Sequence, residues 1–201
     1  MKNILIILIF IPFIGISQTL ENIDFISPFH DGLSAVKKGN NWAFVDQKGS
    51  IIIDFREDLV KTKTDKGYYP LFSNGKCIIA QKKDDILYYG FIDKKGNISI
   101  EPQFLNVSNF QGDKALALIV HKEIKGYNDI LKKNVVNYHY FEVLIDKNVN
   151  VIDHLSQLAL HVPPKYTRRK NPPVITSKII SDNLIAVKGD DNKWNLRKIS
   201  P

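Results

Sequence analysis

Short runs of apolar residues, separated by Gly, Asn and Asp, follow one another along most of the chain. In "NNWAFVDQKGSIIIDF", residues 40 to 55, Trp42 and Phe44 lie two apart and share one face of a strand, while Ala43 and Val45 point to the other face. Apolar side chains on both faces are typical of a strand packed between neighbours. The pattern therefore predicts a hairpin of two strands in an all-β fold.

The turn of this hairpin has the form Asp-x-x-Gly. The side chain of Asp46 can accept hydrogen bonds from backbone N–H groups two or three residues on, and Gly49 supplies the positive φ that starts the return strand. A general base or a calcium ligand is the other interpretation of Asp46. A single acid followed by Lys48, rather than by further oxygen donors, favours the turn role.

Nearly the same phrase returns as "YYGFIDKKGNISIEPQF", residues 88 to 104, in which Asp93 and Gly96 repeat the turn. The strand before the phrase repeats as well, because "GLSAVKKGNNW" from Gly32 resembles "NLIAVKGDDNKW" from Asn183. Looser copies begin at Phe72 and at Phe110, and the latter leads into "FEVLIDKNVNVI", which ends at residue 152. Such periodicity is the signature of a repeat architecture.

We therefore expect tandem antiparallel β-hairpin or meander repeats in an open array, with a partial propeller-like arrangement as the alternative. Residues 18–201 would form one β-repeat domain of about four units, in which the third unit is degenerate and the fourth is truncated at Pro201.

These motifs resemble the WG-repeat (KWG-repeat) family of bacterial β-rich repeats, over residues 25–154 and 181–199. The dipeptide that names the family is divided here, since Ala43 follows Trp42 and Gly90 follows Tyr89. The third unit departs further: Glu142 replaces the aromatic residue and Val149 the glycine. The closing Ile-x-Pro-x-Phe of the family is present in the second unit, at residues 100–104. The resemblance implies an array of antiparallel β units, without an enzymatic activity common to the family.

Residues 1–17, "MKNILIILIFIPFIGIS", differ from the rest of the chain. A single Lys2, an apolar run and a small-residue exit at Gly15 and Ser17 predict a secretory signal peptide. A membrane anchor is the alternative, but the run is shorter than the roughly 20 residues that cross a bilayer, and Pro12 interrupts it. We expect a secreted or periplasmic protein, with no transmembrane span after signal removal.

The composition fits a packed domain, with 44% hydrophobic and 24% charged residues. The only cysteine is Cys77, so no internal disulfide can form, and its place in "CIIA" predicts a core residue. His154 and His161 are seven residues apart, without a further nearby ligand, so we expect no metal site. No catalytic residue and no cofactor are predicted, because the sequence contains none of the common nucleophile, phosphate-binding or zinc motifs.

Two segments lie outside the repeat pattern. Residues 121–140 form an insertion whose second half is rich in Val and Tyr, so we expect an elongated hairpin that projects from the array, on a binding face or as a tolerated surface loop. In "DHLSQLALHV", residues 153–162, the three- and four-residue spacing of Leu155, Leu158 and Val162 predicts a short helix packed on the sheet.

Residues 163–173, "PPKYTRRKNPP", form a basic loop framed by proline pairs. Its cations are available to an acidic partner if the loop is extended, and solvated surface is the other interpretation. The candidate partner-binding residues are Lys165, Arg168, Arg169 and Lys170. The signal peptide argues against nucleic acid as the partner.

The sequence thus favours an exported, non-catalytic repeat protein that binds a protein or glycan of the cell envelope. A structural or accessory subunit of an envelope assembly, with edge strands that pair with another chain, is the alternative. A hydrolase that uses Asp46 or Asp93 would require those acids to face a cleft.

Overall fold

A computed structural model describes residues 20–83, 86–156, 159–161, 172–189 and 191–199. The predicted signal peptide lies outside the described residues. The elements in the described part are all strands, so the all-β prediction is confirmed. No helix in these ranges is long and apolar enough to cross a membrane.

The first half of the array contains nine strands, from the amino-terminal end to the end of the second unit. They are β1 Phe25–Ile26, β2 Ser34–Lys38, β3 Asn41–Val45, β4 Ile51–Arg56, β5 Thr62–Thr64, β6 Gly67–Tyr69, β7 Cys77–Lys83, β8 Ile86–Ile92 and β9 Ile98–Val107. The second half follows with β10 Lys114–Asn128, β11 Lys133–Asp146, β12 Val151–His154, β13 Ala159–His161, β14 Lys178–Ser181, β15 Leu184–Lys188 and β16 Trp194–Lys198.

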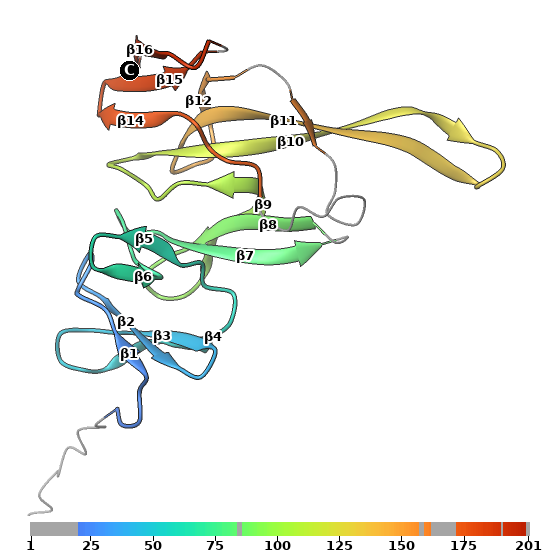
Figure 1. Ribbon diagram of the computed structural model, residues 1–201. Helices are drawn as coiled ribbons and strands as arrows, with labels where there is room; N and C mark the ends of the chain where they lie inside the picture. Colours follow the sequence, from blue (N-terminus) through green and yellow to red (C-terminus); the bar gives the residue numbers. More distant parts are fainter. Residues whose placement is uncertain (1–19, 84–85, 157–158, 162–171, 190, 200–201) are drawn as a thin grey trace, which may run out of the picture.

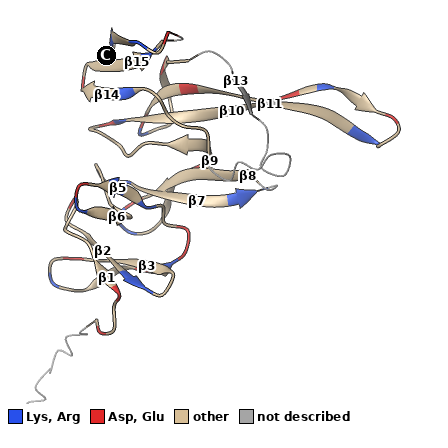
Figure 2. Cartoon of the chain, in the orientation of Figure 1, with Lys and Arg blue, Asp and Glu red and all other residues tan. Residues whose placement is uncertain are grey.

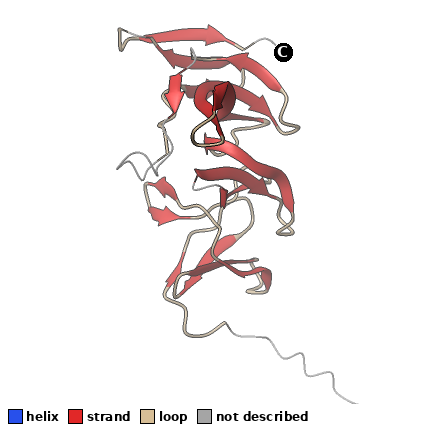
Figure 3. Cartoon of the chain, turned by 90° about the vertical axis from the view of Figure 1, so that its right-hand side faces the viewer, coloured by secondary structure: helices blue, strands red, loops and turns tan. Residues whose placement is uncertain are grey.

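The strands form separate antiparallel sheets that stack along one axis (Figure 1). The sheet orders are β1-β2-β3-β4, then β12-β11-β10-β9-β8-β7 with β13 also paired to β11, then β14-β15-β16, and the small pair β5-β6. Figures 1 and 3 place β1–β4 and β14–β16 at opposite ends of the molecule. A propeller-like closure would bring those ends together, so the arrangement is the open array.

One hairpin recurs four times with the same pairing. The first strand of each unit is β2, β7, β10 or β15, and the second is β3, β8, β11 or β16. The first residue pair of the repeat is Ser34↔Val45, and the equivalent pairs are Cys77↔Ile92, Ala115↔Ile145 and Ile185↔Arg197. The repeat seen in the sequence is therefore a repeat of register, in all four units.

The turn aspartate bonds to its own turn as predicted, but the second N–H group lies four residues on rather than three. Asp46 Oδ1 accepts hydrogen bonds from the backbone N–H groups of Lys48 and Ser50, both at 2.9 Å. Asp93 Oδ1 accepts the equivalent bonds from Lys95 at 2.9 Å and Asn97 at 3.0 Å. Gly49 and Gly96 have φ values of +80° and +84°, the left-handed region that favours glycine. The hairpin prediction and the positive φ are both confirmed.

The third unit keeps this turn although its sequence is degenerate. Asp146 Oδ1 accepts bonds of 2.8 Å from the N–H groups of both Asn148 and Asn150. Val149, which stands in the place of the glycine, has φ +69°. A β-branched residue is strained there, so the aspartate bonds and the packing of Val149 on the neighbouring core cluster hold the turn against that strain.

The core is a row of apolar clusters, largely shared between successive units. The cluster of the first unit includes Phe44, Phe72 and Cys77, and the rings of Phe44 and Phe72 meet edge to face with centroids 4.7 Å apart. Phe91 and Phe110 make the same kind of contact in the next cluster, at 4.9 Å. The predicted core position of Cys77 is confirmed, since it is fully buried.

The helix predicted over residues 153–162 is wrong. The described residues of this segment lie in β12 and β13, which both pair with β11, and in the non-helical residues Leu155 and Ser156. β11 is 14 residues long, and both short strands pair with one of its edges. β12 pairs along Val143–Ile145, and β13 pairs along Tyr138–Tyr140. Of the predicted helix face, Leu155 is buried in the core, and Leu158 and Val162 lie outside the described residues.

Gly90, the glycine of the divided dipeptide, is required by space rather than by φ. A Cβ atom at Gly90 would lie 2.4 Å from the carbonyl oxygen of Ile100 and 2.7 Å from the nitrogen of Pro102. The cause is the pairing of β8 with β9, where Tyr89 faces Phe104 and Phe91 faces Ile100, so β9 bulges toward the glycine.

Gly90→Ala should therefore destabilise the protein by about 2 kcal/mol, because the methyl group meets backbone that cannot give way easily. Ala43→Gly, at the equivalent position of the first unit, should cost less, about 0.5 to 1 kcal/mol. Denaturant unfolding measures both. A Gly90→Ala protein as stable as the parent would contradict the close approach of β9.

Gly49→Val and Gly96→Val should each cost about 1 to 2 kcal/mol, because both place a β-branched residue at positive φ. Gly96 should cost more, since its Cβ would lie 3.4 Å from the side chain of Ile53, whereas that of Gly49 meets open space. Thermal melts of the two variants test this order, and equal melts for both variants and the parent would refute it.

Candidate functional site

Residues 163–171 of the basic loop proposed from the sequence lie outside the described residues. Its four candidate cations, Lys165, Arg168, Arg169 and Lys170, all belong to this part of the loop. The described part of the chain offers three candidate surfaces: the joints between units, the β10–β11 hairpin and the end strands.

The turn aspartates are committed to the backbone. Slight burial acts to raise the pKa of Asp93, but the N–H groups of Asn97 and Lys95 outweigh it and hold the pKa below its usual value. The balance is the same at Asp146, where bonds from Asn150 and Asn148 lower the pKa. A carboxylate stabilised in its charged form by its own turn is a poor general base. These acids therefore act as structural groups.

Cys77 is also unsuited to chemistry. It lies within the first core cluster, and burial raises the pKa of its thiol far above the ordinary value. The thiolate is the reactive form of cysteine, so this thiol is inert.

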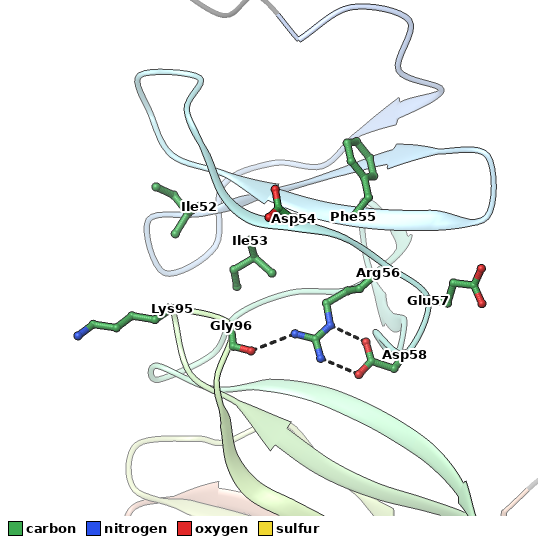
Figure 4. Close-up of a pocket in the computed structure, with 9 residues that line it drawn as sticks. All are labelled: Ile52, Ile53, Asp54, Phe55, Arg56, Glu57, Asp58, Lys95 and Gly96. Atoms are coloured by element: carbon green, nitrogen blue, oxygen red, sulfur yellow. Dashed lines mark hydrogen bonds and ion pairs between the residues drawn. The ribbon is translucent and has the colours of Figure 1, made fainter.

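A shallow groove lies between the first and second units (Figure 4). It has a volume of about 560 Å³ and is lined by Ile52, Ile53, Asp54, Phe55, Arg56, Glu57, Asp58, Lys95 and Gly96. Glu57 and Lys95 point away from its centre in Figure 4. Convergent polar groups, which a small-molecule site needs, are thus confined to Arg56 and its partners.

Arg56 links the two units within this groove. Its Nε and Nη2 donate to the two carboxylate oxygens of Asp58, at 2.6 and 2.7 Å, and its Nη1 donates to the carbonyl oxygen of Gly96 at 3.0 Å. The bond to Asp58 raises the pKa of the guanidinium, which stays charged. The groove is therefore a joint between units.

Asp31 makes a second link across the same joint. One carboxylate oxygen lies 2.9 Å from Lys94 Nζ, and the other accepts the backbone N–H of Gly75. Burial acts to raise the pKa of Asp31, but the bonds from Lys94 and Gly75 prevail and lower it. Both partners belong to the second unit, so this acid ties the first unit to it.

The β10–β11 hairpin is the surface that differs most from an ordinary repeat. The pairing of β10 with β9 ends at Ile119, while its pairing with β11 continues to Asn128↔Lys133. The ribbon beyond, here called the arm (residues 121–140), projects from the side of the array in Figure 1, as predicted. Charged residues of both signs lie along it (Figure 2).

One face of the arm continues the core outward. At its base, Val120 and Tyr140 are cross-strand partners that pack on a buried cluster containing Leu118. Ile124 pairs with Val136 farther out, and the even spacing places this pair on the same face. Ile124 is nevertheless 60% exposed. The apolar face thus leaves the core without a covering layer in the described part of the chain.

The tip of the arm presents large aliphatic side chains to solvent. Ile130 is 91% exposed and Leu131 66%. Their backbone N–H groups both donate to Asn128 Oδ1, at 3.0 and 2.9 Å, which holds the turn in one shape. Turn positions normally take small or polar residues, so this ordered turn places two apolar side chains where solvation alone would not favour them.

The opposite face of the arm is polar. His121 pairs with His139, and Glu123 with Asn137. Glu123 Oε1 lies 2.7 Å from Lys125 Nζ, and Glu123 Oε2 lies 3.3 Å from His139 Nε2 without hydrogen-bond geometry. No group of three His, Cys, Asp or Glu side chains within the described ranges is arranged to hold a metal ion. The arm is therefore an amphipathic ribbon with an apolar tip.

The chain is, by its fold, a tandem array of antiparallel β-hairpins. The family model of the WG containing repeat matches residues 22–42 and 89–119, which reach Trp42 in the first unit and start at Tyr89 in the second. The chain thus contains WG-type repeats in these two segments. Comparison with curated proteins and with solved structures gave no match.

Sequence reasoning located the arm but missed its two faces and the role of Glu142. This buried carboxylate accepts the N–H of Ser177 at 2.8 Å on one oxygen, and the N–H and hydroxyl of Thr176 at 3.0 and 3.1 Å on the other. It thereby fixes the segment that enters β14. The sequence could have indicated this role, because Glu142 occupies a core position that is aromatic in other units, and a buried carboxylate requires hydrogen-bond donors.

The link made by Asp31 predicts a pH dependence. Because its folded pKa lies below the unfolded value, it stabilises the protein above the unfolded pKa of about 3.9, and this contribution is lost as the pH falls through the folded pKa. Asp31→Asn should lower the free energy of unfolding by less than about 1 kcal/mol at pH 7. In acid the variant should not show the additional loss that the parent shows when its Asp31 is protonated. Urea unfolding at pH 7 and pH 3 measures this. Asp65→Asn, at an exposed acid of the β5–β6 turn, is the control, and an equal loss in both variants would contradict the link.

Proposed function

We propose that this protein is an exported, non-catalytic interaction module that binds a protein or a glycan of the cell envelope through the arm. The observation that carries the proposal is the uncovered apolar surface of the arm, from Ile124 to the tip at Ile130 and Leu131. Contiguous exposed apolar side chains are costly in a soluble protein and mark interaction sites.

The construction of the arm supports this role. Its apolar face continues a core cluster, and the tip is held by Asn128, so little conformational entropy is lost when a partner covers it. Tyr127, 55% exposed, adds an aromatic ring with a hydroxyl group, the kind of side chain that contributes most at interfaces.

Export and the absence of catalysis are parts of the same proposal. The pattern of residues 1–17 supports export. A binding role without turnover is supported by the recurring acids, which serve their own turns, and by the burial of Cys77.

A second candidate function is that of an accessory subunit in an envelope assembly. The observation that favours it is the open edge of β16, the last strand of the array, all of whose residues are exposed. Edge strands of this kind can pair with another chain.

Retention on envelope fractions tests the arm. Labelled Ile130→Ser/Leu131→Ser protein should be retained at least about tenfold more weakly than the parent on envelopes of the source cells, because the apolar contact is lost. Its melt should match that of the parent, since both side chains are exposed. Pretreatment of the envelopes with protease or with glycosidases distinguishes a protein from a glycan partner.

The matched control is Val174→Ser/Ile180→Ser, which removes side chains that are 75% and 54% exposed elsewhere on the molecule. It should be retained like the parent. If the arm variant is retained as strongly as the parent, or the control loses as much as the arm variant, the arm is not the contact element.

A further inference from the structure

The four-fold repetition of one hairpin gives each residue of β16 a counterpart in the other units. Trp194 faces Lys188 across its hairpin as Trp42 faces Lys37 in the first unit. The counterparts in the second and third units are Tyr89 and Glu142, which face Ala80 and Leu118. Two positions along, Leu196 has the counterparts Phe44, Phe91 and Leu144.

At this position the side chains of β3, β8 and β11 are buried, whereas that of β16 is exposed. Phe44, Phe91 and Leu144 are each 0% exposed, whereas Leu196 is 66% exposed. Trp194 is 47% exposed, against 6% for Trp42. The same position of the same hairpin thus changes from core to surface in the last unit.

Two features distinguish the covered strands from β16: apolar residues of the following unit pack on Phe44, Phe91 and Leu144, and a third strand pairs with each of their strands. β4, β9 and β12 pair with the outer edges of β3, β8 and β11. Within the ranges that the structure describes, β16 pairs only with β15, and its other edge is open. Lys178 Nζ lies 4.9 Å from the centre of the Trp194 ring, so a cation lies over this indole, whereas Trp42 packs in the first core cluster and meets the ring of Phe25.

We propose that the outer edge of β16 is an acceptor for a β-strand of another polypeptide, which pairs with it as β4 pairs with β3. In each of the three covered units the covering element is an antiparallel strand. Its residue opposite this position is Asp153 in the degenerate third unit, where it faces Leu144, and is aliphatic in the first two units. Ile53 and Ile100 take that place opposite Phe44 and Phe91. The incoming strand therefore carries an aliphatic residue to face Leu196. This inference deepens the second candidate function, on which it rests, and does not depend on the role of the arm.

Arg197 adds a preference for charge. Its counterparts Val45 and Ile92 face Ile51 and Ile98 of the third strands, two residues before the aliphatic position. Arg197 is exposed, and its Nη1 donates to the carbonyl oxygen of His154 at 3.3 Å. A carboxylate in the incoming strand fits opposite it. The partner is a strand of the pattern acidic-x-aliphatic.

Tryptophan fluorescence tests the acceptor edge directly, because the chain has only two tryptophans. In a Trp42→Tyr background, which places the residue of the second unit in the first, Trp194 is the only reporter. The probe is a synthetic peptide of residues 50–58, "SIIIDFRED", with Ile51→Glu. It should shift the Trp194 emission to shorter wavelength saturably and protect it from quenching by acrylamide, and the unmodified peptide should bind several-fold more weakly.

Leu196→Glu should weaken binding of the probe at least about tenfold, while Ile180→Glu, on the other edge strand of the same sheet, and Ile130→Glu, on the arm, should leave it unchanged. Thermal melts check that each variant is folded. If neither peptide moves the emission, or a scrambled peptide moves it equally, the acceptor proposal is wrong. If the two peptides bind equally, the acidic preference is wrong. Loss of arm-dependent retention alone would bear on the proposed function and leave this result unaffected.

Discussion

The structure depends on one carboxylate that accepts two backbone N–H groups in the turn between the second and third strands of each of the first three units. Asp46, Asp93 and Asp146 all make the pair of bonds, at 2.8 to 3.0 Å. A side-chain periodicity of two means that a slip of one residue would turn every core residue of a strand to the other face. By fixing where the chain reverses, the aspartate fixes which residues are buried. The third turn shows the strength of the constraint, since it holds even with Val149 at positive φ.

The joints between units use different polar residues for one purpose. Arg56 bonds to the turn of the second unit, Asp31 to Lys94 and Gly75 of that unit, and Glu142 to the segment that enters the fourth. Each polar group lies where successive sheets meet and is satisfied there. Polar contacts of this kind give orientation to layers whose apolar contacts are less directional. The array is thus held by repeated turns within units and by particular contacts between them.

The features that the sequence predicts correctly are those that depend on residues close together in the chain. The hairpins at residues 40–55 and 88–104, and the arm, follow from turn residues and apolar patterns that act over a few positions. The predicted helix fails because the spacing of Leu155 and its neighbours is short enough to suit either element, and the long free edge of β11 decides between them. Of the candidate site, its location in the insertion was predictable. The apolar face of the arm was not, because the bulge at Lys125 and the register of the ribbon set which residues share that face.

The central claim is that one hairpin is used four times and that the last copy is uncovered. Native-state hydrogen exchange, resolved to single amides, tests it most directly. The account predicts slow and similar exchange for the amides of residues 43–45, 90–92 and 143–145. It predicts exchange at least roughly a hundredfold faster for those amides of residues 195–197 that point to the open edge of β16, because no acceptor strand protects them. Equal protection in all four units, or fast exchange at 143–145, would contradict it.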